Sequence, residues 1–379
     1  MTMIIPENHI ALVMLLGRRD EPTDGVEDYC FFLAEALRQR GASAKLVRVP
    51  WAQRGWLSAL LWLWKESAEW RGRWVLVQYT ALGWSRRGFP LGLLPVLFLL
   101  RHRNLPIAVI FHDAAGYSGT RWVDRARRTI QQFVMRQMAT QAKRAILPAS
   151  SEQLTWLKSQ RRKAVFIPVG SNIPPPPERD KQMEGRAATQ CESKIVVVFG
   201  ITPGERGEQE MTDVREAMKT ASQCAPHVQL CAFGRGTREA EPMLRRCFEA
   251  VGLEVLVLGL LPATAIGEIL SRADLQVDVR DRISSRRGSV IAAIVCGTPV
   301  VGFESAETDA AIREAGVVLL PPGDIKALAA AVTHILSDDS FREQLRLRNR
   351  IATQRFFSWD AISGKLLGAL QECDRVSSS

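Results

Sequence analysis

The chain has 379 residues, a net charge of +10 and 46% hydrophobic residues, values typical of a folded globular protein with two domains. Its seven cysteines and five histidines are scattered, without C-x-x-C pairs or metal-ligand spacing, which argues against a disulfide framework and a zinc site. The longest apolar run, residues 89–100, is shorter than the roughly 20 residues of a membrane-spanning helix. We therefore expect a reducing compartment and no transmembrane helix, and we interpret residues 1–19 as a first strand rather than a signal peptide.

The positive charge is concentrated in the first half of the chain. Residues 1–180 hold 26 Lys and Arg against 14 Asp and Glu, whereas the remainder holds 24 against 26. No nucleic-acid-binding motif accompanies this excess, so we expect no nucleic acid partner. An anionic membrane surface is the partner that the charge favours.

Short apolar, β-branched runs alternate with helical patterns along the first half. The predicted strands are residues 10–16, 45–49, 74–79, 107–111, 145–148 and 165–168. Between the first two, residues 28–41 have the spacing of an amphipathic helix that ends at Gly41. This alternation predicts a parallel sheet covered by helices on both faces.

Four consecutive prolines, Pro174 to Pro177, mark the clearest domain boundary, because they cannot continue a helix or a central strand. We predict an N-terminal domain of residues 1–174, a linker of residues 175–193 and a C-terminal domain of residues 194–357. A last helix, residues 358–372, is expected to pack back on the first domain. The second series of predicted strands is residues 195–199, 229–233, 255–258, 275–279, 298–301 and 317–319. The fold class is therefore α/β, with two Rossmann-like doubly wound domains that face each other across a cleft and bind ligand at the carboxyl ends of their strands.

An ordered series of short motifs runs through both halves. In the second half they are Gly259 to Pro262, Ser271 to Leu275, Gly297 to Val301, Ala315 to Asp324 and Phe357 to Asp360. In the first half they are Gly25 before an amphipathic helix, Phe111 to Asp113 at a strand end, and Ile167 to Pro174. In this order and spacing the series resembles the GT-B glycosyltransferases of family four, over nearly the whole chain.

This resemblance implies a nucleotide-sugar-dependent enzyme that retains anomeric configuration and needs no cofactor and no bound metal. It implies that His112 is catalytic and lies near the transferred sugar, at the carboxyl end of a very apolar strand. Asp113 then orients His112 on the acceptor side, or caps the next helix instead. It also implies that Gly25 lets a loop approach the donor phosphates, although the family often has two adjacent glycines and Asp24 precedes this one.

The chain departs from the family at its charged positions. Where the family has two glutamates, this chain has Ser284 and Ala292, and where it has an Arg and a Lys this chain has Ile201 and Arg206. The loop Ser284 to Ser289 replaces the acidic segment, which resembles a branch of the family with an S-x-R-R-G-[ST] loop.

The residues of this loop suit a diphosphate. Arg286, Arg287, Gly288 and Ser289 directly precede a predicted helix, whose N-terminus offers free N–H groups and the positive end of a dipole. Arginine can also grip phosphate oxygens in a bidentate way. The alternative is a solvated basic loop in which Ser285 or Ser289 caps the helix. Arg206, in a glycine-flanked turn after a strand, is a further donor-binding candidate or part of a plain surface turn.

The tryptophans of residues 51–84 lie mostly on helical spacing and are expected in the core. Gln78 and Tyr79, at a strand end, are better placed to meet an acceptor. Residues 84–103 join two arginines and aromatic residues to the apolar run, which is typical of an interfacial element; a buried helix explains residues 89–100 equally well.

Together these features predict a hexosyl-type glycosyltransferase that moves a sugar from a nucleoside-diphosphate sugar to a glycan or lipid-linked acceptor in cell-surface polysaccharide synthesis. We expect it in the cytoplasm, peripherally attached to the inner face of the cell membrane. Two alternatives stay open. One is a catalytically degenerate GT-B protein that binds a sugar nucleotide or serves as a partner subunit, favoured by the missing glutamates. The other is a GT-B-fold sugar-nucleotide epimerase, which would be expected to use several carboxylates.

Overall fold

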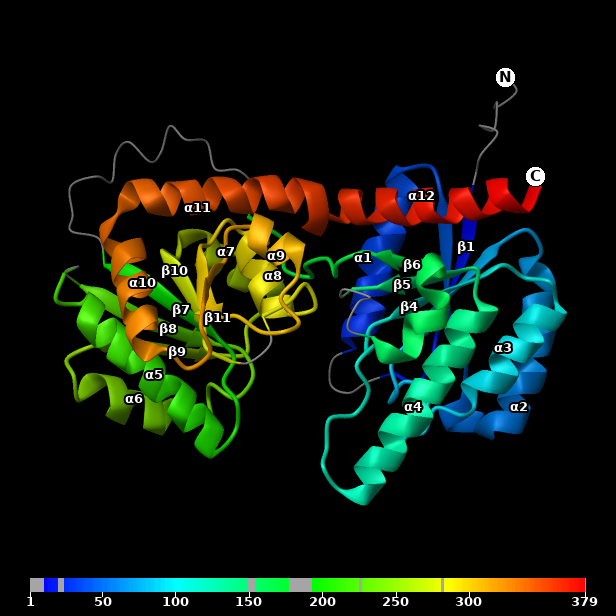
Figure 1. The fold of residues 1–379 in the computed structure, drawn as a ribbon, viewed down its shortest axis with the longest axis horizontal. Coiled ribbons are helices and arrows are strands. Elements are labelled where there is room, and N and C mark those ends of the chain that lie inside the picture. The colour runs from blue at the N-terminus through cyan, green and yellow to red at the C-terminus, as the bar shows by residue number, and fades with distance from the viewer. Residues whose placement is uncertain are drawn as a thin grey trace. The chain divides into compact units, whose positions relative to one another are not determined.

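The computed structural model places every predicted strand in one of two six-stranded parallel sheets. It describes residues 10–19, 24–148, 154–176, 193–224, 227–280 and 283–378. The chain divides into unit 1, which is Met1–Pro168 with Trp359–Ser379, and unit 2, which is Val169–Ser358 (Figure 1). Residues 177–192 of the predicted linker lie outside the described residues. The predicted α/β class with two doubly wound parallel sheets is confirmed.

The sheet of unit 1 has the strand order β2-β1-β3-β4-β5-β6. Its strands are β1 (Ala11–Leu16), β2 (Ser43–Arg48), β3 (Trp74–Tyr79), β4 (Ile107–Phe111), β5 (Arg144–Leu147) and β6 (Ala164–Phe166). Strands β3 and β4 are buried at every residue, because helices cover both faces of a parallel sheet. The order of the chain across the sheet reverses between β1 and β3, which makes their carboxyl ends the natural ligand-binding edge.

The helices of unit 1 connect these strands. They are α1 (Gly25–Gln39), α2 (Trp51–Glu66), α3 (Leu93–His102), α4 (Trp122–Gln141) and α12 (Trp359–Ser378), with short 3₁₀ helices at Ser67–Trp70 and Thr155–Lys163. Helix α1 begins three residues earlier than predicted, because the Asp24 carboxylate accepts hydrogen bonds from the N–H groups of Val26 and Glu27. Gly41, just beyond its end, has the left-handed φ of +78° that favours glycine.

Unit 2 repeats the architecture with the order β12-β11-β10-β7-β8-β9. Its strands are β7 (Lys194–Phe199), β8 (Val228–Phe233), β9 (Glu254–Gly259), β10 (Leu275–Asp278), β11 (Val300–Phe303) and β12 (Val318–Leu320). Its helices are α5 (Glu205–Ala221), α6 (Glu241–Glu249), α7 (Ala263–Arg272), α8 (Gly288–Val295), α9 (Ala310–Glu314), α10 (Ile325–Ser337) and α11 (Asp339–Ala352), followed by a π-helical turn at Thr353–Phe357. Here the chain order reverses between β7 and β10.

The structure corrects the interpretation of residues 84–103. The Trp84 side chain is buried and its indole N–H donates to the carbonyl of Gln78, 2.8 Å away. Five of the ten residues of α3 are buried, on its apolar side, so the buried-helix explanation holds for the apolar run and residues 84–103 as a whole are not an interfacial element. Phe98 is an exception at 70% exposed. The expectation that the tryptophans belong to the core fails at Trp64, which is exposed on α2.

Helix α12 ends the chain on unit 1, where it packs against α1. Its Trp359 stacks on Phe32 and meets Tyr29 edge-on, with ring centroids 5.6 and 5.2 Å apart. Leu366 is 1% exposed on its buried side. The helix therefore belongs to the core of unit 1 although it follows all of unit 2 in sequence.

We expect Leu366→Ala to lower the free energy of unfolding by about 2–5 kcal/mol, because it leaves a cavity in a packed core. The matched control is Leu347→Ala on α11, where the side chain is 50% exposed and the change should stay within about 0.5 kcal/mol. Denaturant unfolding of both variants and the parent protein measures the difference. Equal effects of the two substitutions would mean that α12 is not part of the core.

Candidate functional site

The reversal of chain order in unit 2 brings two loops together at the carboxyl edge of the sheet. One loop follows β7 and leads to α5; the other follows β10 and leads to α8. Arg280 joins them, because its Nη2 donates to the carbonyl of Phe199 at the end of β7, 2.6 Å away. Gly200, with a φ of +79°, lets the chain turn there, and a side chain at that position would lie against Arg280 and Arg235.

Asp278, the last residue of β10, is the centre of this edge. Its side chain is 1% exposed, and the Arg287 Nε lies 2.9 Å from its Oδ2. Arg280 Nη2 approaches the same oxygen at 3.5 Å, and the Ser289 hydroxyl donates to it at 3.5 Å. A buried carboxylate is costly unless it is paired and hydrogen-bonded, and these three groups supply that compensation. Burial lowers the pKa of Arg287, and the Asp278 charge opposes that shift.

The adjacent arginine of the loop is held by a different segment. Ser285 is fully buried, and both its backbone N–H and its hydroxyl donate to the Asp309 carboxylate, at 2.8 and 2.7 Å. The same carboxylate caps α9. Arg286 follows directly, and its Nη2 lies 3.7 Å from the Glu307 Oε2. The loop is thus anchored on both sides of Arg286, whose side chain is 21% exposed.

The first turn of α8 lies open beside these arginines. Arg287 occupies the N-cap position, and its side chain makes no capping hydrogen bond there. The alternative in which Ser285 or Ser289 caps the helix is therefore wrong: Ser285 bonds to Asp309, and Ser289 to Asp278. Gly288 is exposed, with no other group within 4 Å of where a side chain would begin. Free N–H groups at an uncapped helix N-terminus suit an anion.

Arg206 lies in the first turn of α5, on the other loop of the same edge. Its side chain is 57% exposed, and its Nε lies 3.2 Å from the Oε1 of the buried Glu210. The second oxygen of Glu210, Oε2, is buried without a hydrogen-bond partner among the described residues. The charge of Glu210 also acts on the pKa of Arg287, so these side chains form one cluster with Asp278. The structure therefore brings the predicted donor-binding residues of unit 2 together.

In unit 1, His112 follows β4 at the carboxyl edge of the sheet. Its Nε2 lies 2.8 Å from the Gln78 Oε1, and the edge of the Tyr29 ring packs against it with centroids 4.9 Å apart. The Gln78 amide nitrogen donates to the Leu76 carbonyl, so its oxygen faces His112 and the proton belongs on Nε2. Desolvation lowers the pKa of His112 to about 4, although the nearby Asp24 opposes the shift. The ring is therefore neutral near pH 7.

The structure gives less support to a ligand contact for the other predicted residues of unit 1, Gly25 and Tyr79. Gly25 is the first residue of α1 and is exposed, and none of the described residues beyond its chain neighbours comes within 4 Å of where its side chain would begin, but the Asp24 carboxylate beside it already accepts from the first N–H groups of the helix. Tyr79 is 1% exposed and packs on Phe111, with its hydroxyl buried and unpartnered among the described residues, so it offers an acceptor no exposed atom. This burial contradicts the acceptor-side interpretation, because Tyr79 points into the core while Gln78 contacts His112.

Asp113 remains partly exposed at the end of β4. The His112 ring donates from its Nε2 to the Gln78 Oε1, so Gln78 orients the ring, and orientation by Asp113 stays a prediction. The capping alternative for Asp113 is wrong, because the next helix, α4, begins at Trp122 with Arg121 at its N-cap and Asp124 in its capping box. The charge of Asp113 does act on Tyr79: after desolvation it is the second cause that raises the pKa of that phenol.

The described residues hold neither a metal-binding cluster nor a membrane-spanning helix. Within the described ranges, no three His, Cys, Asp or Glu side chains gather where they could hold a metal ion. None of the helices in those ranges is both long enough and apolar enough to cross a bilayer.

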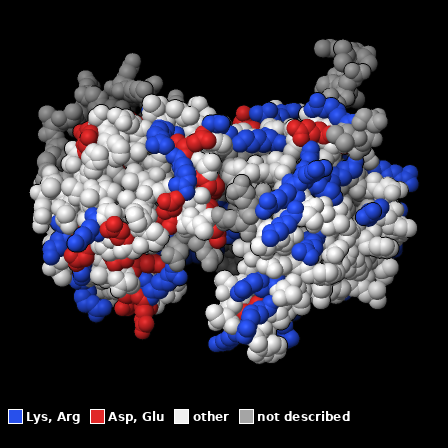
Figure 2. Space-filling view, in the orientation of Figure 1, with Lys and Arg blue, Asp and Glu red and all other residues white. Residues whose placement is uncertain are grey.

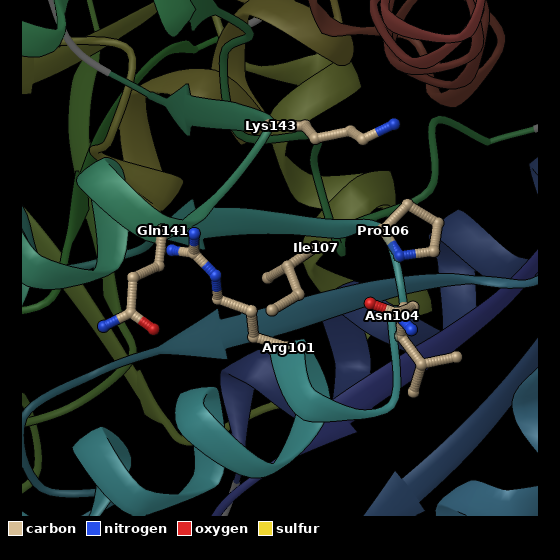
Figure 3. A pocket seen from close by; sticks show the side chains of 7 residues that line it. Arg101, Asn104, Pro106, Ile107, Gln141 and Lys143 are labelled. Carbon is tan, nitrogen blue, oxygen red and sulfur yellow. The ribbon is translucent and has the colours of Figure 1, made fainter. Parts of the chain in front are cut away.

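A separate pocket of about 300 Å³ lies at the opposite, amino edge of the unit 1 sheet, between the ends of α3 and α4 and the starts of β4 and β5 (Figure 3). It contains none of the predicted site residues.

Comparisons with known proteins agree with this geometry. Residues 158–338, just under half of the chain, match the family model described as glycosyl transferases group 1. The structure is similar to that of HepE from Anabaena, solved with UDP and glucose (17% identity, 96% of this chain and 100% of that chain, TM-score 0.64). It is also similar to a glycosyltransferase from Rickettsia africae (12%, 97% and 99%, TM-score 0.71).

The chain has the GT-B fold. A third similar structure is that of a Listeria monocytogenes protein provisionally named a UDP-N-acetylglucosamine 2-epimerase (12% identity, 98% of each chain, TM-score 0.62). Among curated proteins, no sequence matches this one. Identities this low establish the architecture alone, whereas the family match to residues 158–338 and the GT-B fold together support a glycosyltransferase. Membership of family four and the retaining outcome stay predictions.

Sequence reasoning missed the acidic and amide partners of the site. Asp278 was included in a predicted strand, yet a charged residue at the carboxyl end of a buried strand is the same signal that drew attention to His112. Gln78 was predicted, with Tyr79, to meet an acceptor, but its contact with His112 was not predicted. Asp309 carried no local signal, because its role depends on a tertiary contact with Ser285. Glu210 lies four residues after Arg206 on α5, which is the spacing of a helical ion pair, so its signal was local and was overlooked.

The lowered pKa of His112 makes a prediction about stability. An unfolded histidine has a pKa of about 6.5, so below pH 6.5 the unfolded chain binds a proton while the folded ring stays neutral. Protonation then favours the unfolded state, and the free energy of unfolding decreases as the pH is lowered. Between about pH 7.5 and pH 5 the loss from this group should be about 2 kcal/mol. His112→Gln should lose correspondingly less over the same interval in denaturant unfolding. A parallel pH dependence in the two proteins would contradict a desolvated, neutral ring.

Proposed function

We propose that this protein is a glycosyltransferase that moves a sugar from a nucleoside-diphosphate sugar to a glycan or lipid-linked acceptor in cell-surface polysaccharide synthesis. One observation carries the proposal: the arginines of unit 2 converge on the open first turn of α8, at the edge where β7 and β10 meet. This edge is the ligand-binding position of doubly wound sheets, and it lies within the segment that matches the group 1 model.

The chemistry requires cations where the donor breaks. As the bond between the anomeric carbon and the diphosphate oxygen lengthens, negative charge grows on the departing nucleoside diphosphate. Arg206, Arg286 and Arg287 can offset that charge together with the N–H groups at the start of α8. The acceptor hydroxyl oxygen then bonds to the anomeric carbon, the electron pair of the broken bond stays on the diphosphate oxygen, and the hydroxyl proton passes to the departing diphosphate. With these cations in place the reaction needs no bound metal, and from the family resemblance we propose that it retains the anomeric configuration.

We place the acceptor at the carboxyl edge of the unit 1 sheet, with His112 as the contacting group. Because Gln78 fixes the Nε2 proton of the neutral ring, the opposite nitrogen, Nδ1, is left as an acceptor for a sugar hydroxyl. A neutral imidazole can hydrogen-bond a hydroxyl without adding charge. Gly25, exposed at the start of α1, keeps its proposed role as a point where the chain can approach a phosphate closely.

The two alternatives differ in their products. A degenerate GT-B protein would bind a sugar nucleotide without turning it over, and the replacement of both family glutamates by Ser284 and Ala292 is its main support. An epimerase would return an altered sugar nucleotide and no nucleoside diphosphate. The carboxylates at this edge, Asp278 and Glu210, each face an arginine, which is the arrangement of structural ion pairs rather than of free acid and base. Analysis of the products of turnover separates the three functions.

A donor screen by thermal shift, followed by turnover assays, tests the proposed function. We expect one nucleoside-diphosphate sugar to raise the unfolding temperature, because it binds only the folded state. Arg286→Ala, Arg287→Ala and Arg287→Lys should each weaken donor binding or turnover at least tenfold, about 1.4 kcal/mol. Arg287→Lys keeps the positive charge beside Asp278 but loses the bidentate geometry, so it separates phosphate recognition from stability.

The control is Arg350→Ala, an exposed arginine of α11 far from this edge in sequence, which should change neither binding nor turnover. Unchanged activity in all three loop variants would show that the arginines serve only as a solvated loop. Donor binding without release of nucleoside diphosphate would favour the degenerate protein.

We expect donor turnover to survive complete chelation of divalent metal, because arginines and the α8 N-terminus supply the positive charge that a metal would otherwise provide. Turnover should be compared in chelator alone and in chelator followed by excess Mg²⁺ or Mn²⁺. A complete loss that either metal restores would overturn the metal-independent mechanism.

We also propose that the protein attaches peripherally to the inner face of the cell membrane through unit 1, which would bring it to a lipid-linked acceptor. The excess of Lys and Arg in residues 1–180 supports this attachment, and on the visible face of unit 1 these residues greatly outnumber Asp and Glu (Figure 2). A basic residue near an anionic surface contributes roughly 1 kcal/mol, so a few can hold a protein reversibly.

A further inference from the structure

Four large apolar side chains form an exposed ridge on unit 1. Leu57, Leu61 and Trp64 lie about one turn apart along the outer face of α2 and are 77%, 61% and 39% exposed. Phe98 on the adjacent helix α3 is 70% exposed. The His102 ring links the two helices, with centroids 5.6 Å from Trp64 and 6.3 Å from Phe98. We call these four residues the α2–α3 ridge.

Positive charge surrounds the α2–α3 ridge. The guanidinium of Arg103 lies 3.6 Å from the centroid of the Trp64 ring, a cation–π contact, and Arg101 follows Phe98 by about one helical turn. Across residues 51–105, which include both helices, there are eight Lys and Arg and two Glu. One of these glutamates, Glu66, is paired with Lys45. A contiguous apolar patch rimmed by cations is unusual on a surface that faces only water.

A basic pocket adjoins the α2–α3 ridge. Arg101 at the end of α3, Gln141 at the end of α4 and Lys143 before β5 line it, together with Asn104 (Figure 3). Lys163 lies close by: burial lowers its pKa, and the charge of Arg101 lowers it further. Two acids of α12 lie in this region: Glu372 is paired with Arg144, and Asp374 accepts from the indole of Trp74, the ring that Lys143 faces. Arg101 and Lys163 repel each other, and an anion beside Arg101 would offset that repulsion.

We propose that the α2–α3 ridge docks on an anionic lipid bilayer and that the adjoining pocket receives the phosphate of a lipid headgroup. This inference rests on the proposed peripheral attachment of unit 1 and names the surface that makes it. The ridge would lie among the headgroups and the first acyl carbons, where Trp and Leu side chains are favourable, while Arg101 and Arg103 contact phosphates. The surface is therefore α2 with part of α3, not residues 84–103 as a whole.

The basic residues beside the α2–α3 ridge favour an anionic bilayer over a second copy of this chain or a neutral protein as the occupant of this apolar surface. A second copy of this chain would bring the same basic rim against itself, and like charges across an interface disfavour association. A neutral protein partner would use the apolar side chains but leave the arginines without counter-charge. An anionic bilayer supplies both an apolar interior and a plane of phosphates, so it uses every part of the surface at once.

The experiment is co-sedimentation of the full-length protein with vesicles of phosphatidylcholine alone or mixed with phosphatidylglycerol. We expect partition into the mixed vesicles that weakens with salt. The double variant Leu57→Gln/Leu61→Gln should lower this partition at least tenfold, because two exposed leucines lose their apolar contact with lipid. Its matched control is Leu347→Gln/Ile351→Gln, a pair with the same spacing that is 50% and 56% exposed on α11 of unit 2.

The pocket is tested in the same assay. Arg101→Gln should lower partition into the mixed vesicles about fivefold, the effect of one basic residue at an anionic surface. Arg350→Gln removes the same charge from unit 2 and should leave partition nearly unchanged. Circular dichroism and donor binding in solution, measured on every variant, check that the fold and the unit 2 site are intact.

The outcomes separate the surface from the attachment. If the parent protein enters neither vesicle, both the peripheral attachment and this surface are wrong. If it binds mixed vesicles and the Leu57/Leu61 variant binds equally well, or its α11 control loses as much, the attachment stands and the assignment to the α2–α3 ridge is overturned. If Arg101→Gln and Arg350→Gln lower partition into the mixed vesicles equally, the net charge of the protein alone controls binding, and the assignment of the pocket to a lipid headgroup is overturned. None of these results depends on sugar transfer.

Discussion

The carboxylate of Asp278 is the constraint on which the unit 2 site depends. It is buried at the end of β10, so its charge must be met by nearby donors, and Arg287, Arg280 and Ser289 supply them. Each donor comes from a different part of the edge, and Arg280 reaches onward to the carbonyl of Phe199. One buried charge therefore holds the end of β10, the start of α8 and the end of β7 in a single arrangement.

The elements of this edge could be predicted from the sequence because their signals are local. Parallel strands read as short apolar runs between helical patterns, and all twelve appear close to their predicted positions. The donor-binding candidates also followed from local pattern, since arginines and a glycine stand before a helix. One acidic partner did not, because Asp309 contacts Ser285, 24 positions earlier, only once the loops have folded. Glu210 follows Arg206 by about one turn of α5, so its pairing was local in the sequence and was overlooked.

In unit 1, too, the sequence pattern does not predict which of two adjacent residues makes a contact. Adjacent residues of a strand point to opposite faces, so Gln78 and Tyr79 cannot both meet a ligand at the end of β3. From the sequence alone, either residue could face the ligand. In the structure Tyr79 packs on Phe111, whereas Gln78 contacts His112. Trp64 illustrates the reverse case. Its helical spacing resembles that of core residues, but α2 turns this position outward, and only the three-dimensional structure separates a buried face from an exposed one.

The pairing of the arginines also shapes how a diphosphate could bind. Among the described residues of the unit 2 edge, Arg206, Arg280, Arg286 and Arg287 each face a carboxylate, that of Glu210, Asp278 or Glu307, which offsets much of their positive charge. Net charge alone would then attract a diphosphate only weakly. What such a site offers is orientation: the carboxylates hold the guanidinium groups in fixed positions beside the open turn of α8, so little reorganisation is needed when charge develops on a departing group. In this arrangement the acids position the arginines, and the N-terminus of α8, where the side chain of the N-cap residue Arg287 makes no capping hydrogen bond, adds backbone donors.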